Sequence, residues 1–252
     1  MSKRVLRLNL RTQALQQDEG GHNYWQELNQ VEEFTCADTA LLLCDVWDKH
    51  WSRGATERVD AMVPHMDQVV GAARSRGVQI LHAPSSTMEF YADTSSRRRL
   101  LEAPAVELPV EREREDPPLP VDAADGGSDT GEAESYKAWY RQHPGISIDQ
   151  GQDGISDEGQ EVYNFMAQQG IHNILIMGVH TNMCVLNRSF AIKQMVRWGK
   201  KVALIRDLTD TMYNPASPPY VSHEAGTHLV IEYIEKFWCP SVLSEDIIAS
   251  CR

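Results

Sequence analysis

The sequence has no excess of positive charge and no long apolar run. Its 36 acidic residues outnumber its 24 lysines and arginines, which gives a formal net charge of −12. Binding to nucleic acid needs a basic patch, and the short run from Arg97 to Arg99 is more typical of a solvated helix face. No segment has the apolar length that spans a bilayer. We therefore expect neither a nucleic-acid partner nor a membrane partner.

The first residues, MSKRVLRLNLRTQ, lack the apolar stretch of a secretory signal, so we expect a cytoplasmic protein.

Paired cysteines are absent too. The cysteines form no CxxC pair, which favours free thiols over a disulfide framework or a zinc site. We predict no metal and no cofactor, and at least one cysteine that is free to act as a nucleophile. The five cysteines are Cys36, Cys44, Cys184, Cys239 and Cys251.

The sequence does have a regular alternation of apolar strands and amphipathic helices. Apolar runs predict strands over 39–46, 78–84, 173–179 and 201–207. Three- and four-residue spacing predicts helices over 55–76, 159–169, about 183–198 and 223–237, three of them followed by a glycine. Strands that alternate with helices favour βαβ crossovers and a mostly parallel sheet with helices on both faces. We expect one α/β domain over 1–252.

Two segments lie outside this alternation. Residues 1–38, approximately, form an N-terminal extension, and residues 103–135 form an inserted loop rich in proline, glycine and acidic side chains. The loop is either a solvated excursion or a cover for the active site, since long insertions in compact α/β domains often line such sites.

Cys184 is the first candidate for chemistry. Active sites of open parallel sheets lie beyond the carboxyl ends of the strands, and Cys184 follows the apolar strand 173–179 at the start of a helix. Backbone N–H groups there favour an anion, so we expect a lowered thiol pKa and donors for an oxyanion. The alternative is that Cys184 is a small buried apolar residue.

Asp45 is the second candidate, because it ends an apolar strand where an unpaired carboxylate is costly. It is either the general base for the thiol or a structural cap. Asp207 also ends a predicted strand, but its surroundings are more typical of a cap.

These two sites carry a resemblance. The chain resembles the isochorismatase-like cysteine hydrolases, which include nicotinamidase and N-carbamoylsarcosine amidohydrolase. The resemblance is carried by the strand that ends in Asp45 and by the segment MGVHTNMCV, and it extends from about Thr39 to Ile234. The resemblance implies a three-layer α/β/α fold and an aspartate–lysine–cysteine triad, with Asp45 as base and Cys184 as nucleophile. It also implies a cis peptide between Val179 and His180, and an oxyanion site formed by N–H groups near His180 and Cys184.

The chain departs from that pattern at two positions. The segment expected to carry the lysine, ISIDQGQ at 146–152, has none. We rank Lys137 first as the substitute cation, followed by Lys49 and Arg141. The Asp-x-His that holds a metal in nicotinamidases is replaced by HAPSSTMEF, so His82 is interpreted as a hydrogen-bonded histidine and no zinc is predicted.

The loop after Asp45 supplies aromatic side chains that suit a planar or cationic small molecule. In the alternative interpretation, one or both tryptophans of this loop pack against the helix behind it. The predicted substrate-binding residues are Trp47, His50, Trp51, His180, Thr181 and Tyr213.

The sequence therefore predicts a cysteine-dependent hydrolase that cleaves a C–N bond, in an amide, ureide or similar small molecule, through a thioester-like intermediate. Two alternatives remain: a catalytically silent binding or scaffold protein of the same fold, and an ester or enol-ether hydrolase like the isochorismatases. Surplus apolar residues near the C-terminus, among them Phe237 and Trp238, predict a homo-oligomer.

Overall fold

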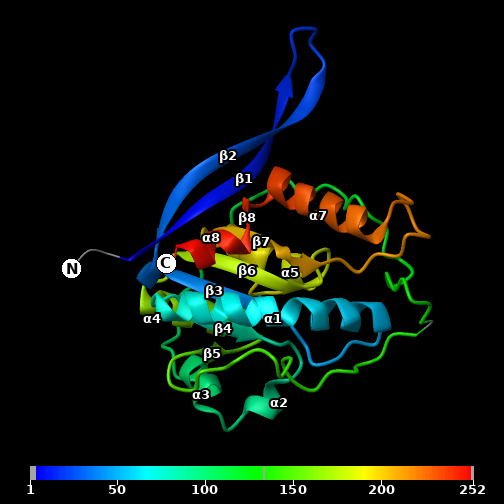
Figure 1. Ribbon diagram of the computed structural model, residues 1–252. Coiled ribbons are helices and arrows are strands. Elements are labelled where there is room, and N and C mark those ends of the chain that lie inside the picture. Colours follow the sequence, from blue (N-terminus) through cyan, green and yellow to red (C-terminus); the bar gives the residue numbers. More distant parts are fainter. Residues whose placement is uncertain (1–3, 133, 251–252) are drawn as a thin grey trace.

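The computed structural model describes residues 4–250 apart from residue 133. An eight-stranded sheet runs through its centre in the order β2-β1-β8-β7-β6-β3-β4-β5 (Figure 1). The strands from β8 to β5 are parallel, and β1 is antiparallel to both of its neighbours. The strands are β1 (Val5–Gln17), β2 (Asn23–Thr35), β3 (Thr39–Cys44), β4 (Gln79–Ala83), β5 (Gly154–Ile155), β6 (Asn173–Val179), β7 (Lys201–Asp210) and β8 (Ser241–Val242).

Helices cover both faces of this sheet, which is why every residue of β3 is buried. Leu41 and Leu43 pack into the core beneath α1 (Arg53–Ser75) and α8 (Ser244–Ala249). Leu42 faces the opposite core, beneath α4 (Gly159–Gln169), α6 (Ile192–Arg197) and α7 (His223–Phe237). The predicted three-layer α/β/α fold with a mostly parallel sheet is confirmed. Shorter helices are η1 (Cys36–Asp38), α2 (Met88–Tyr91), α3 (Ser95–Leu101) and α5 (Cys184–Asn187).

The helix predicted over 183–198 is wrong, since the chain forms two short helices there. The first, α5, ends before Arg188, whose backbone is extended at φ −61° and ψ 152°. The break is packed rather than loose, because the carbonyl of Ser189 lies so close to Gly159 that a Cβ would collide with it. This break directs the side chain of Arg188 back toward β3.

The N-terminal extension forms a long antiparallel hairpin, β1–β2, that sequence patterning did not predict. Its register is continuous from Val5 opposite Thr35 to Gln17 opposite Asn23. Figure 1 shows the hairpin twisting away from the body of the protein, so that its turn lies well beyond α7. In the part of the chain described, no helix is both long and apolar enough to cross a membrane.

Candidate active site

Asp45 lies at the carboxyl end of β3, where the sheet opens toward the loops. It is completely buried, and its φ of 49° places it in the left-handed region, which aspartate tolerates better than most residues. Its backbone N–H donates to the carbonyl of Ala83 at 3.0 Å, which ties it to the end of β4. The carboxylate is therefore fixed in one direction before any substrate arrives.

Three groups surround that carboxylate. The backbone N–H of Ser85 donates to Oδ1 at 2.7 Å, and Nε of Arg188 donates to Oδ2 at 3.0 Å. The thiol of Cys184 is the third group, and it interacts electrostatically with the carboxylate. Burial raises the pKa of Asp45, while Arg188, Cys184 and Ser85 act in the opposite direction. Asp45 is thus a buried acceptor beside a thiol and a guanidinium.

The thiol of Cys184 does not have the lowered pKa expected from its helix position. Burial and the negative charge of Asp45 raise its pKa to about 12, although Arg188 and the backbone of His180 partly offset them. Since α5 is only four residues long, its dipole is small. The expectation fails because desolvation and a neighbouring carboxylate outweigh the helix terminus. In the free protein the sulfur carries its proton.

Arg188 provides the cation at this cluster. Its ion pair with Asp45 and the nearby thiol raise its pKa further, against the effect of burial, so it stays charged. Arg188 lies four residues after Cys184, just beyond the end of α5, and its extended backbone lets the side chain reach Asp45. The one signal in the sequence was an arginine close after the cysteine, which sequence analysis missed.

Two of the cations predicted from the sequence, Lys137 and Arg141, make their contacts away from Asp45, whereas Lys49 lines a small cavity together with it. Lys137 is exposed, and its Nζ donates to the carbonyl of Ser86 at 2.6 Å rather than to Asp45. Arg141 lies over the ring of Phe90, at 5.5 Å from its centroid. Lys137 lies on the rim because its loop crosses the end of β4, and the position beside the carboxylate is already filled by Arg188.

The turn that carries Cys184 is held by backbone contacts. The peptide between Val179 and His180 is cis. The carbonyl of His180 accepts hydrogen bonds from the N–H groups of Met183 and Val185, at 3.0 and 3.2 Å. As the first residue of α5, Cys184 has an N–H with no acceptor inside the helix.

Two polar side chains fasten the turn to β7. Thr181 is buried, with its N–H donating to the carbonyl of Asp210 at 2.8 Å and its hydroxyl bonded to Thr209. Asn182 donates to the carbonyl of Met212 and accepts from the same residue's N–H. Thr181, predicted to touch substrate, is therefore a support for the turn.

The aromatic residues after Asp45 form a stack that includes one residue not predicted. Trp139 lies parallel to Trp47 with ring centroids 4.1 Å apart, and His50 stacks on its edge at 5.8 Å. The remaining cavity here, bounded by Asp45, Trp47 and His180, is only about 10 Å³. These side chains fill one another's space and leave no room for a substrate on this side.

The other predicted wall residues differ in their surroundings. His180 is buried, and burial lowers its pKa to about 3, so its imidazole is neutral. Trp51 is half-buried against Gly126 of the long acidic loop, which therefore lies beside this part of the site. Tyr213 is wrong as a wall residue: it is fully buried in the core, and its hydroxyl donates to the carbonyl of Ser217.

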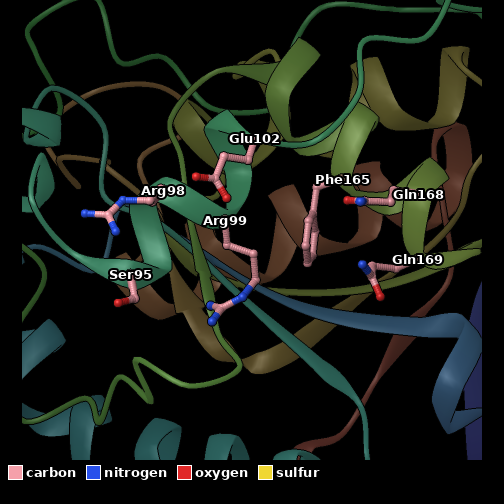
Figure 2. Close-up of a pocket in the computed structure, with 7 residues that line it drawn as sticks. All are labelled: Ser95, Arg98, Arg99, Glu102, Phe165, Gln168 and Gln169. Atoms are coloured by element: carbon pink, nitrogen blue, oxygen red, sulfur yellow. The ribbon is translucent and has the colours of Figure 1, made fainter.

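Open space adjoins Cys184 on its other side. A cavity of about 390 Å³ is bounded by Asn182, Met183, Cys184, Asn187 and Arg188. A larger hollow of about 500 Å³ lies between α3 and α4, where Figure 2 shows Arg98, Arg99 and Phe165 around it; it contains none of the residues of the cysteine cluster. The cavity beside Cys184 is the one where a small molecule can reach the sulfur.

No group of histidine, cysteine, aspartate or glutamate side chains among the described residues has the arrangement of a metal site. His82 is buried, with Nδ1 at 2.9 Å from Gln142 and Nε2 at 3.1 Å from Asp153. These contacts make it a hydrogen-bonded core histidine, as interpreted from the sequence.

A cysteine, an aspartate and a cation thus lie together at the carboxyl edge of the parallel sheet. Residues 39–217 match the model of the Isochorismatase domain, and the chain belongs to this family of hydrolases. No curated protein sequence matches it.

Solved structures agree on the fold. A cysteine hydrolase from Pseudomonas syringae pv. phaseolicola 1448A is similar with a TM-score of 0.54 at 14% identity, over 86% of this chain and 94% of that one. An isochorismatase from Pseudomonas putida KT2440 has a TM-score of 0.50 at 12% identity, over 83% of this chain and 90% of the other. The family match covers the strands from β3 to β7 and the cysteine turn, but leaves out the hairpin and the chain after residue 217.

Proposed function

We propose that this hydrolase cleaves a C–N bond, in an amide or ureide of a small molecule, through a thioester on Cys184. The supporting observation is the cluster of Cys184, Asp45 and Arg188, in which a buried carboxylate interacts with the thiol and accepts a hydrogen bond from a guanidinium. The cavity of about 390 Å³ beside the sulfur suits a small substrate.

In the first half-reaction, Sγ of Cys184 attacks the carbonyl carbon while Asp45 takes the thiol proton. The C–N bond then breaks, and Asp45 gives that proton to the departing nitrogen. In the second half-reaction, water attacks the thioester; Asp45 accepts a proton from the water and returns it to the sulfur. The products are a free amine or ammonia and the acid, and the enzyme is regenerated.

Arg188 takes the role of the lysine that the chain lacks. Because the thiol is protonated in the free protein, the proton has to move as the carbon–sulfur bond forms. A nearby permanent positive charge lowers the cost of that step, since it offsets the negative charge shared by Asp45 and the sulfur. The N–H of Cys184, with those near His180, is the proposed donor set for the oxyanion.

A catalytically silent binding protein is the second candidate, and two observations favour it: the raised thiol pKa, and the aromatic stack that fills the space near Asp45. Turnover separates the two. The protein is incubated with a panel of small amides and ureides, and released ammonia or amine is measured beside the variants Cys184→Ala and Asp45→Asn.

We expect turnover of at least one compound by the parent protein, and its loss in both variants. Full turnover by Cys184→Ala overturns the mechanism. No turnover across the panel, with Cys184 alkylated no faster than an unperturbed thiol at neutral pH, establishes the silent candidate. Hydrolysis of esters or enol ethers alone establishes the isochorismatase-type alternative.

A further inference from the structure

The β1–β2 hairpin has two halves with different surroundings. Near its base, Leu6, Leu8 and Leu10 are buried in the core. Toward its turn the apolar side chains are exposed, by 40–54% of their surface. This second set consists of Leu15, Tyr24, Trp25 and Leu28, and Val31, nearer the base, is exposed to a similar extent. The outer half thus carries more apolar surface than the hairpin itself can cover, and it lies outside residues 39–217 that match the family.

β2 is the outermost strand of the sheet, so one of its edges faces solvent. The direction of its backbone groups follows from β1. The N–H groups of Arg7 and Asn9 bond to Ser250 and Asp246, on the side of β1 away from β2. Since direction alternates along an antiparallel ladder, the residues opposite them point outward from β2. The odd-numbered residues 25–33 therefore present their N–H and C=O groups to the free edge.

Nothing along this edge blocks the pairing of another strand. Exposed edges of natural sheets are usually short, or carry lysine, proline or a bulge. β2 is 13 residues long, has neither lysine nor proline in NYWQELNQVEEFT, and keeps an uninterrupted register with β1. An edge of this kind is suited to main-chain pairing with a further strand.

We propose that the partner is a second copy of this chain, whose β2 pairs antiparallel with this β2 about a twofold axis at Leu28. In that register Leu28 lies opposite its own copy and Trp25 lies opposite Val31. Each glutamate lies opposite an uncharged residue: Glu27 opposite Asn29, Glu32 opposite Tyr24, and Glu33 opposite Asn23. The strand is therefore complementary to itself in both apolar contacts and charge.

Other centres lack this complementarity. A centre at Glu27 places two glutamates face to face, and a centre at Gln30 places Glu27 opposite Glu33, which is destabilising in either case. A centre at Asn29 sets Trp25 opposite Glu33. A centre at Gln26 leaves only residues 23–29 paired. Registers that place an odd-numbered residue opposite an even-numbered one are also excluded, because only the odd-numbered residues of β2 point their N–H and C=O groups outward.

Cysteine cross-linking tests the register directly. In the proposed pairing Leu28 forms a non-hydrogen-bonded pair, with Cα atoms about 4.5 Å apart, which is within reach of a disulfide. We expect Leu28→Cys to give a disulfide-linked dimer under mild oxidation. The matched control is Gln30→Cys on the same strand face: its two copies lie about 13 Å apart, beyond disulfide reach, so it and the parent protein stay uncross-linked.

Mass in solution supplies the second measurement. Light scattering is expected to give twice the chain mass of 28.4 kDa for the parent protein. Leu28→Arg, which sets two positive charges across the axis, is expected to give the single-chain mass with an unchanged circular dichroism spectrum, because Leu28 is 41% exposed. A monomeric parent, a dimer that survives Leu28→Arg, or cross-linking of Gln30→Cys in place of Leu28→Cys overturns the proposal.

Discussion

Replacing Arg188 with methionine removes the charge beside Asp45 and keeps much of the apolar length of the side chain. The carboxylate and the thiol interact directly, so they titrate as a pair. Arg188 lowers the pKa of both members, and its loss therefore raises both macroscopic pKa values of the pair. We expect Cys184 to become less reactive at neutral pH.

The size of the effect follows from geometry. An opposite charge within about 4–6 Å shifts a carboxyl pKa by about 1–3 units, and Nε of Arg188 lies 3.0 Å from Oδ2 of Asp45. Because the Arg188 side chain is 36% exposed, solvent screening favours the lower part of that range, about 1–2 units. Alkylation of Cys184 at neutral pH is then expected to slow by about 10- to 100-fold.

The assay is the rate of iodoacetamide labelling of Cys184 against pH, followed by peptide mass spectrometry. It needs no substrate. Lys137→Met is the matched control: its ammonium contacts the carbonyl of Ser86, so we expect less than about a twofold change. Arg188→Lys, which keeps a charge without the Nε contact, is expected to fall between the two. Unchanged labelling in Arg188→Met, with slowed labelling in Lys137→Met, refutes the assignment of the cation.

Two further predictions concern stability. Trp139→Ala removes a ring that stacks on both Trp47 and His50 and is expected to lower the free energy of unfolding by about 1–3 kcal/mol in urea titration. Tyr140→Ala, at a residue that is 74% exposed, is expected to change it by less than about 0.5 kcal/mol, and equal effects would contradict the stack's contribution. Burial opposes the charge on His223, but the contact of its imidazole with Asp210 outweighs burial and raises the pKa of His223 above 6.5. The charged imidazole therefore stabilises the fold fully below pH 6.5, and this stabilisation is lost as the pH rises through the folded pKa. His223→Gln is expected to flatten that fall in thermal melts between about pH 6 and 9, and an unchanged profile would contradict this linkage.

The sequence predicted the parallel core well, because each buried strand there is a continuous apolar run. The runs before Asp45 and Cys184 lie in β3 and β6, whose carboxyl ends meet at one edge of the sheet. A rule about strand ends was therefore enough to bring these two residues together.

The rest of the site depended on details that periodicity does not carry. The break after α5 arises from tertiary packing of Ser189 on Gly159, and it is this break that turns Arg188 toward Asp45. The raised pKa of Cys184 depends on how deeply the sulfur is buried. The hairpin was missed because most of β2 is exposed, so the alternation of buried and exposed residues that marks a strand is absent from its sequence.

The central claim is that Cys184 forms a covalent bond to the substrate's acyl carbon with the help of Asp45 and Arg188. Its most direct test is acid quenching of the protein during turnover of a hydrolysed amide, followed by intact-mass measurement and peptide mapping. The account predicts an added mass equal to the acyl group, on the peptide that contains Cys184, and no such adduct in Cys184→Ala. Turnover without any adduct, together with full activity in Cys184→Ala, would contradict it.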